Sequence, residues 1–140
     1  YAYSTDRFAT EADYLERYPG DDIIDMLAFD LYDRGPEYGT VLNYCAKTVS
    51  RLAEERGKLA ALSEAGGPIY KQTDWWTNTL LASLKGITLS YVLVWRNPWQ
   101  DGEAAFGPWK GHPSAADFVK FYADPQTLFL REVAAENLYR

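Results

Sequence analysis

The residues that could do chemistry gather just after four short apolar runs. They are residues 4–7, together with carboxylates, a tyrosine, a guanidinium, an amide and indole rings: Asp30, Tyr32, Asp33, Arg34, Glu64, Trp95, Arg96, Asn97 and Trp99. Carboxyl groups cleave glycosidic bonds, and flat rings stack on the C–H face of a sugar. The set suits a metal or phosphate site poorly. It predicts carboxylate chemistry on a carbohydrate that needs no metal and no other cofactor.

Glu64 stands out because it closes an almost uniformly apolar run that begins at residues 59–62. A charged side chain in that position is costly unless it is paired or used. The spacing alone favours a catalytic carboxylate and a salt bridge at the rim of the fold equally. Asp30 and Asp33 are more typical of turn formers or partners for Arg34.

The chain has one cysteine and one histidine, which limits nucleophile and metal chemistry. Cys45 lies on the apolar stripe of a helical pattern, which predicts packing, and His112 is placed to position its loop before Pro113. A Cys45–His112 nucleophile pair is therefore disfavoured. A zinc site would need carboxylates or another chain beside the one histidine.

The elements that must position these residues repeat in the order apolar run, polar turn and helical pattern. The runs, read as strands, cover residues 1–4, 23–32, 59–62 and 87–95, and the last has the strongest strand pattern. Four strand-to-helix units in succession predict parallel strands joined by crossover helices.

The helical patterns begin or end at residues with suitable capping chemistry: Thr10, Gly57, Asp74, Gly86, Ser114 and Asp124. Thr10 with Asp13 and Ser114 with Asp117 predict capping boxes. The pattern over 41–56 is strongly amphipathic, with apolar residues every three or four positions. A last helix is predicted to start at Asp124-Pro125, with proline in its permitted first turn.

Two α/β architectures fit this order: an open doubly wound sheet, or part of an eight-stranded barrel. The Gly-x-Gly-x-x-Gly turn of a dinucleotide-binding sheet is missing from the sequence. A complete (β/α)8 barrel takes about 250 residues, whereas this chain of 140 residues contains four strand-helix units. We therefore expect residues 1–140 to form one domain that is half of a TIM barrel.

Composition excludes several classes of protein. A net charge of −6 argues against a nucleic-acid partner, and no apolar run is long enough to span a membrane. The sequence shows neither a signal peptide nor an initiator Met. Aromatic residues make up 16%, with 5 Trp and 11 Tyr, which suits either a tyrosine-rich core or a surface that grips sugars.

Five segments carry a family resemblance. They are LAALSEAGG at 59–67, YVLVWRNPW at 91–99, GHPSAADFVKFYADPQTLF at 111–129, YAYSTDRF at 1–8 and AFDLYD at 28–33. Together they resemble glycoside hydrolase family 26, most closely its endo-β-1,4-mannanases. The resemblance implies the C-terminal half of a (β/α)8 barrel and a retaining mechanism on β-mannan.

The resemblance also implies roles for individual residues. Glu64, at the end of the seventh barrel strand, would be the nucleophile, and Tyr32, at the end of the sixth, would donate a hydrogen bond to it. Residues expected to contact the sugar are Trp95, Arg96, Asn97, Trp99 and His112. The family's acid/base glutamate lies on the fourth strand, which would precede Tyr1.

Half a barrel leaves two strand edges without partners. We therefore expect a complementary N-terminal half-barrel chain, or self-association, to complete the fold. The resemblance implies a secreted, periplasmic or cell-surface protein. Two alternatives stay open: a family member acting on mixed-linkage β-glucan or β-1,3-xylan, and a non-catalytic half-barrel that retains sugar binding through Trp95 and Trp99.

Overall fold

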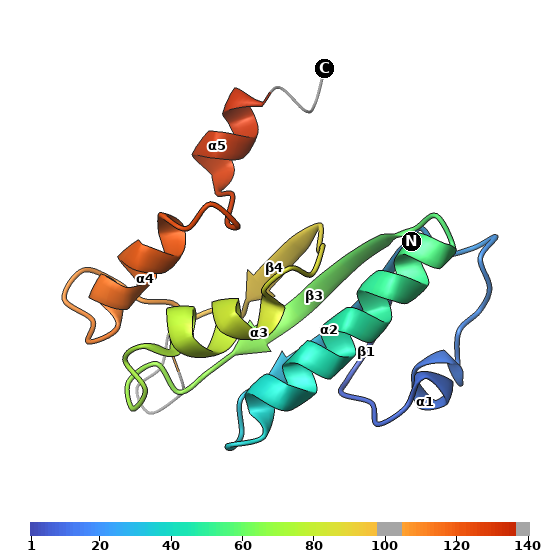
Figure 1. The fold of residues 1–140 in the computed structure, drawn as a ribbon, viewed down its shortest axis with the longest axis horizontal. Helices are drawn as coiled ribbons and strands as arrows, with labels where there is room; N and C mark the ends of the chain where they lie inside the picture. Colours follow the sequence, from blue (N-terminus) through green and yellow to red (C-terminus); the bar gives the residue numbers. More distant parts are fainter. Residues whose placement is uncertain (98–104, 137–140) are drawn as a thin grey trace.

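The structure, a computed structural model, contains a four-stranded parallel sheet with strand order β1-β2-β3-β4 (Figure 1). It describes residues 1–97 and 105–136. The strands are β1 (Ala2–Thr5), β2 (Met26–Tyr32), β3 (Leu59–Gly66) and β4 (Tyr91–Val94). Sequential order with parallel pairing is the arrangement of consecutive strands in a (β/α)8 barrel, as the sequence predicts.

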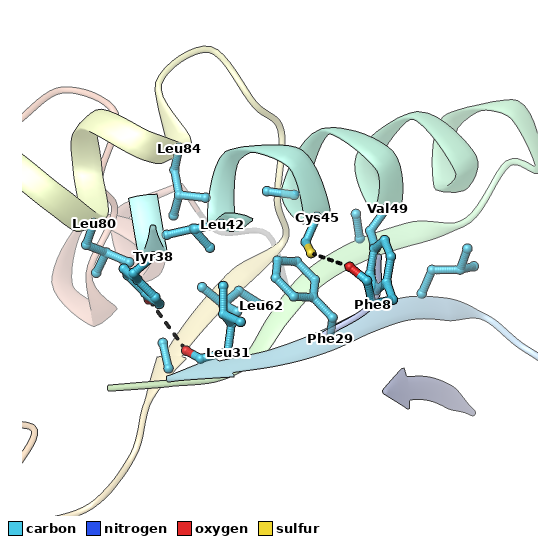
Figure 2. Close-up of a cluster of buried hydrophobic side chains, with 14 of the residues drawn as sticks. Phe8, Phe29, Leu31, Tyr38, Leu42, Cys45, Val49, Leu62, Leu80 and Leu84 are labelled. Atoms are coloured by element: carbon cyan, nitrogen blue, oxygen red, sulfur yellow. Dashed lines mark hydrogen bonds between the residues drawn. The ribbon is translucent and has the colours of Figure 1, made fainter. Parts of the chain in front are cut away.

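The helix α2 (Tyr38–Glu55) covers one face of the sheet and builds the main core (Figures 1 and 2). Its apolar stripe of Leu42, Cys45, Val49 and Leu52 is buried. This stripe packs over the alternate strand residues that point the same way: Leu27, Phe29, Leu31, Ala60 and Leu62. Each leucine, valine or phenylalanine among them stabilises the fold by about 1.5–3 kcal/mol when fully buried. The predicted helix over 41–56 is confirmed, with a start three residues earlier.

The other helices are short. α1 (Glu11–Leu15) begins with the predicted capping box, in which Thr10 and Asp13 exchange hydrogen bonds. The π-helix η1 (Trp76–Leu81) continues into α3 (Ala82–Leu84), and its stripe of Trp76, Leu80 and Leu84 is buried. α4 (Ala115–Tyr122) packs on η1 through Phe118 and Phe121, and α5 (Leu130–Ala135) extends beyond it.

Several expectations about elements are corrected. Asp74 does not cap η1, since its carboxylate accepts from the side chain of Asn78, and the second and third strands cover Met26–Tyr32 and Leu59–Gly66 instead of 23–32 and 59–62. The last helix begins at Leu130 rather than Asp124, because Asp124 closes a turn by accepting from the backbone N–H of Gln126. Ser114 precedes α4 without capping it, since its hydroxyl binds other side chains. The fourth strand covers Tyr91–Val94 instead of 87–95.

Register explains the short fourth strand. Tyr91 pairs with Ala61, so Ile87 would lie opposite Gly57. Gly57 has a φ of +64° and belongs to the turn before β3, so Ile87 finds no strand residue to pair with at that position. Ile87 and Leu89 pack instead against the core.

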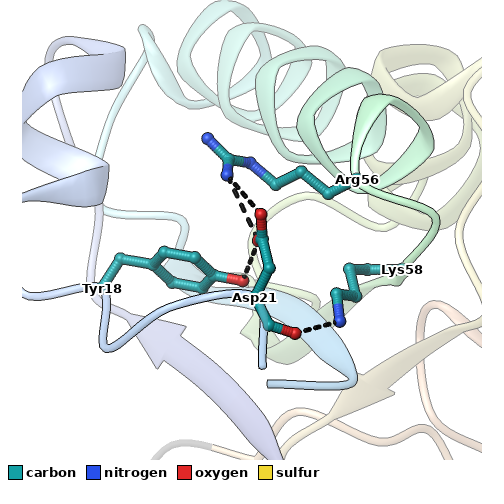
Figure 3. Close-up of polar contacts among 4 residues, drawn as sticks. All are labelled: Tyr18, Asp21, Arg56 and Lys58. Atoms are coloured by element: carbon teal, nitrogen blue, oxygen red, sulfur yellow. Dashed lines mark hydrogen bonds and ion pairs between the residues drawn. The ribbon is translucent and has the colours of Figure 1, made fainter. Parts of the chain in front are cut away.

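A polar cluster joins the loop before β2 to the end of α2 (Figure 3). Asp21 accepts hydrogen bonds from Tyr18 at 2.8 Å and from Arg56 at 3.1 Å, and its carbonyl oxygen accepts from Lys58. Burial of its ring and the bond to Asp21 raise the pKa of Tyr18 to about 12. The bond from Tyr18, with the charge of Arg56, lowers the pKa of Asp21.

The face of the sheet opposite α2 carries partly exposed side chains. Tyr91, Leu93 and Trp95 are each 40–42% exposed there. Among the described residues, β1 pairs only with β2 and β4 only with β3, so both outer edges of the sheet are open. In the same part of the chain, no helix has the length and apolar character needed to cross a membrane.

Candidate active site

A β-bulge in β3 places Glu64 beside β2. Phe29 pairs with Leu62, but the next residue, Asp30, pairs with Glu64, so Ser63 is the extra residue of β3. A bulge of this kind re-aims the side chains around it. It brings Glu64 and Asp30 to the same rung of the sheet, close to the carboxyl ends of both strands.

Tyr32 is bound directly to Glu64. Its hydroxyl donates to Oε2 of Glu64 at 2.8 Å. Burial, together with the Glu64 carboxylate, raises the pKa of Tyr32 to about 12, so the hydroxyl keeps its proton over the whole neutral range. The phenol therefore serves Glu64 as a fixed donor that holds one carboxylate oxygen.

A second carboxylate, Asp30, shares this rung with Glu64 and lies within a small hydroxyl network. The hydroxyl of Ser4 lies 2.6 Å from that of Ser63 and 3.4 Å from Oδ1 of Asp30, while Ser63 also donates to the carbonyl oxygen of Phe29. Burial raises the pKa of Asp30, and the negative charge of Glu64 raises it further. The hydrogen bonds from the serine hydroxyls lower it, but the raising effects are larger. Sequence reasoning assigned Asp30 to a turn or to Arg34, and missed its contact with β1.

Asp33 has the structural role that its sequence context indicates. Its Oδ1 accepts from the backbone N–H of Gly35 at 3.2 Å, and its Oδ2 accepts from Nε1 of Trp75 at 2.9 Å. The first contact forms the predicted turn. The second ties the end of β2 to the segment before η1. The indole of Trp75 then lies over the backbone of Gly67, where a Cβ would be 2.1 Å from it.

Aromatic and polar residues predicted to contact the sugar follow β4. The backbone N–H of Trp95 donates to the carbonyl oxygen of Ala65 at 2.8 Å, which places this partly exposed indole one strand away from Glu64. Arg96 is exposed beside it. The carboxamide of Asn97 is engaged with the backbone of Phe106 and Gly107. Trp99 lies outside the described residues.

His112 is buried rather than open to solvent. Its Nδ1 accepts from the backbone N–H of Ser114 at 3.1 Å, and the rings of Tyr70 and Trp109 pack edge-on against it. Burial lowers the pKa of His112, so the ring is neutral and carries its proton on Nε2. Ser114 in turn accepts from Nε1 of Trp76 at 3.2 Å. The predicted contact of His112 with the sugar stays a prediction.

Cys45 is far from any such role. Its thiol is buried in the core and faces the carbonyl oxygen of Phe8, as Figure 2 shows. Within the part of the chain that the structure describes, no three His, Cys, Asp or Glu side chains are grouped to hold a metal ion. The chemistry that this arrangement supports is that of an oriented carboxylate.

Two hollows among the described residues lie beside this site rather than at Glu64. One of about 570 Å³ is lined by residues of the β2–α2 and β3–η1 loops, among them Asp33, Arg34 and Gln72. A smaller one of about 140 Å³ touches Tyr32. Glu64 stands on the open face of the sheet, where further strands would have to supply the opposite wall of a cleft.

Comparison with known proteins identifies the fold. No protein-family model matches the sequence. A β-mannanase structure from Bacteroides ovatus superposes with a TM-score of 0.87 and 41% identity, over 93% of this chain and 38% of that one. An endo-β-1,4-mannanase structure from Cellulomonas fimi gives a TM-score of 0.81 and 30% identity, over 94% and 32%. A mannan endo-1,4-β-mannosidase of Bifidobacterium adolescentis is 32% identical over 86% of this chain and 14% of its own length.

The parallel strand-helix units and the carboxylate at their C-terminal edge thus define part of a TIM-barrel glycoside hydrolase domain. The chain belongs to glycoside hydrolase family 26, as a homologue of its β-mannanases in both sequence and fold. It spans less than two fifths of each of these relatives. The family resemblance and the partial-barrel fold that the sequence predicts are confirmed.

Proposed function

We propose that this chain supplies the nucleophile of a retaining endo-β-1,4-mannanase. The observation that supports this most is the bond from Tyr32 to Oε2 of Glu64 at a C-terminal strand end. The hydroxyl fixes one carboxylate oxygen, so the other is free to attack the anomeric carbon of the mannose. Fixing the attacking group before the reaction lowers the entropic part of the barrier.

In the proposed reaction, Glu64 forms a covalent bond to the anomeric carbon as the glycosidic oxygen leaves with a proton. A water molecule then attacks the same carbon, gives up a proton, and releases Glu64 as a carboxylate. The proton donor and acceptor is a second carboxyl group about 5–5.5 Å from the nucleophile in retaining enzymes. We place that group on a strand outside this chain, in agreement with the share of the relatives that the chain spans.

The partly exposed indole of Trp95 and the guanidinium of Arg96 suit a sugar platform at the cleavage point. Trp95 is held by its backbone bond to Ala65, the residue after Glu64. A flat ring beside the nucleophile stacks on the apolar face of the mannose. The substrate class, β-mannan, is the one that the names of these relatives indicate for those proteins.

The direct test uses a completed barrel. Residues 1–140 are joined to the N-terminal portion of the Bacteroides ovatus relative, and the release of reducing ends from glucomannan is measured. Glu64→Gln, which keeps the shape of the side chain, should lower kcat by roughly 10⁶-fold, the scale of the loss when a hydrolase is deprived of its nucleophile.

The matched control is Glu54→Gln, because Glu54 is an exposed glutamate of α2 and its substitution should leave kcat unchanged. Substantial activity in Glu64→Gln would contradict the proposal. Equal activity on lichenan would assign mixed-linkage β-glucan, rather than mannan, as the substrate. Binding of manno-oligosaccharide without turnover would favour a sugar-binding remnant.

A further inference from the structure

Phe106 contacts the residue that holds Glu64. Its ring meets the ring of Tyr32 edge to face, with 5.4 Å between centroids. The neighbouring strand leaves room for this contact at Gly66, which pairs with Tyr32 in the β2–β3 register. A Cβ on Gly66 would lie only 2.4 Å from the Phe106 ring. The phenylalanine therefore rests on the last rung of the two strands that carry Tyr32 and Glu64.

Asn97 holds Phe106 in that place. Its Oδ1 accepts from the backbone N–H groups of Phe106, at 3.1 Å, and Gly107, at 2.7 Å. Its Nδ2 donates to the carbonyl oxygen of Gly107 at 2.9 Å. All three contacts tie the chain just after β4 to the segment that carries the phenylalanine. Because both polar atoms of the amide are used, Asn97 is better suited to this clamp than to a sugar.

We propose that Asn97 and Phe106 are positioning residues, which act on the reaction by holding the Tyr32 ring so that its hydroxyl meets Glu64. The inference rests on the proposed function, because it assigns these two residues to the same nucleophile. Asn97 fixes the backbone at Phe106, the Phe106 ring packs against Tyr32, and Tyr32 donates to Glu64.

A double-mutant cycle in the completed barrel tests whether Phe106 acts on Glu64 through Tyr32. Phe106→Ala should lower kcat by about tenfold, the scale of an aromatic pair at the upper end of its range, with little change in KM. In a Tyr32→Phe background, where the hydroxyl is already lost, the same substitution should lower kcat less than about twofold, because residues that act through one another are not additive.

Substitutions at two further positions, Gly66 and Asn97, give independent readouts. Gly66→Ala displaces the Phe106 ring and should reduce kcat as Phe106→Ala does, while adding little in a Phe106→Ala background. Asn97→Ala should also lower kcat without raising KM, and Asn97→Asp, which keeps the acceptor oxygen, should retain more activity than Asn97→Ala. Phe106→Leu preserves the bulk of the side chain and replaces Phe106→Ala if circular dichroism shows that the alanine variant is unfolded.

Equal losses of kcat from Phe106→Ala in the presence and absence of the Tyr32 hydroxyl would overturn the inference. So would an Asn97→Ala variant whose defect lies in KM alone, since that would indicate direct sugar binding. Both results are distinct from a failure of the proposed function, which appears as Glu64→Gln retaining its activity.

Discussion

At the scale of single residues, the site depends on the phenol that holds Glu64. A hydrogen bond to a charged group is worth about 1.5–3 kcal/mol, or roughly 10- to 100-fold in rate when the interaction strengthens in the transition state. Tyr32→Phe removes the donor at 2.8 Å and keeps the ring. We expect kcat on glucomannan to fall by that factor in the completed barrel, with KM little changed.

Tyr44→Phe is the control for this substitution, since Tyr44 lies partly exposed on α2, away from the sheet edge. Its activity should equal that of the parent. If Tyr32→Phe were as active as Tyr44→Phe, the hydroxyl would have no part in holding the nucleophile.

The residue types of the site could be predicted from the sequence because Glu64 and Tyr32 each end an apolar run. The clamp around Asn97 could not, since it depends on hydrogen bonds to Phe106 and Gly107, nine and ten positions further along the chain, and no local pattern indicates contacts at that separation. The β-bulge at Ser63 in β3 could not be predicted either, because a bulge changes the register without changing the apolar character of the strand.

At the scale of elements, the close approach of Trp75 to the end of β3 makes Gly67 a sensitive position. A methyl group there would lie 2.1 Å from the indole, whose Nε1 is bound to Asp33. Gly67→Ala should therefore destabilise the fold by about 1–3 kcal/mol, the usual cost of overpacking. Urea unfolding followed by tryptophan fluorescence measures this loss.

Gly35→Ala serves as the matched change, because nothing lies within 4 Å of the added carbon and the backbone there is not left-handed. It should leave the unfolding midpoint nearly unchanged. Equal midpoints for Gly67→Ala and Gly35→Ala would show that the indole does not rest on the glycine.

The cluster in Figure 3 predicts a pH-dependent contribution to stability. The folded state lowers the pKa of Asp21, so the carboxylate stabilises the fold above its unfolded pKa, and this gain disappears as the pH falls through the lower folded pKa. Asp21→Asn should therefore destabilise the chain at pH 7 and have a smaller effect below about pH 4. Urea midpoints at both pH values test this, and an equal difference at the two would contradict it.

Elements with strong periodicity or capping chemistry were predictable, as α1 and α2 show. The fourth strand was predicted too long because an apolar run indicates burial but not pairing. Ile87 and Leu89 are apolar because they pack against the core, and both lie before the ladder, which starts where Tyr91 pairs with Ala61. The π-helix η1 keeps the apolar face that an α-helix would present, so its altered hydrogen bonding leaves no sequence signal.

At the scale of the whole molecule, the open edges of β1 and β4 predict association. Tyr91 and Leu93 are each 42% exposed on the open face, and unpaired strand edges readily bind other strands. Light scattering of the isolated chain should show self-association, and mixing it with a separately produced N-terminal half should give a defined complex that hydrolyses glucomannan. A well-folded monomer that does not bind the N-terminal half would contradict this.

The repeated strand-helix order was enough to predict parallel strands, since crossover connections leave few alternatives. It could not place these units within a barrel, because all strand-helix units share the same apolar patterning. The placement came from sequence resemblance, and the superposition on family 26 mannanases supports the same part-barrel assignment.

Covalent trapping in the completed barrel tests most directly whether Glu64 attacks the sugar. A dinitrophenyl 2-deoxy-2-fluoro-β-mannoside reacts without a protonated leaving group, and its fluorine slows the second step, so the glycosyl-enzyme accumulates. Mass spectrometry of the digested protein should find one fluoromannosyl group on the peptide with Glu64. The label should persist when the acid/base of the other half is replaced and vanish in Glu64→Gln. A label on Asp30 or any other residue would contradict the account.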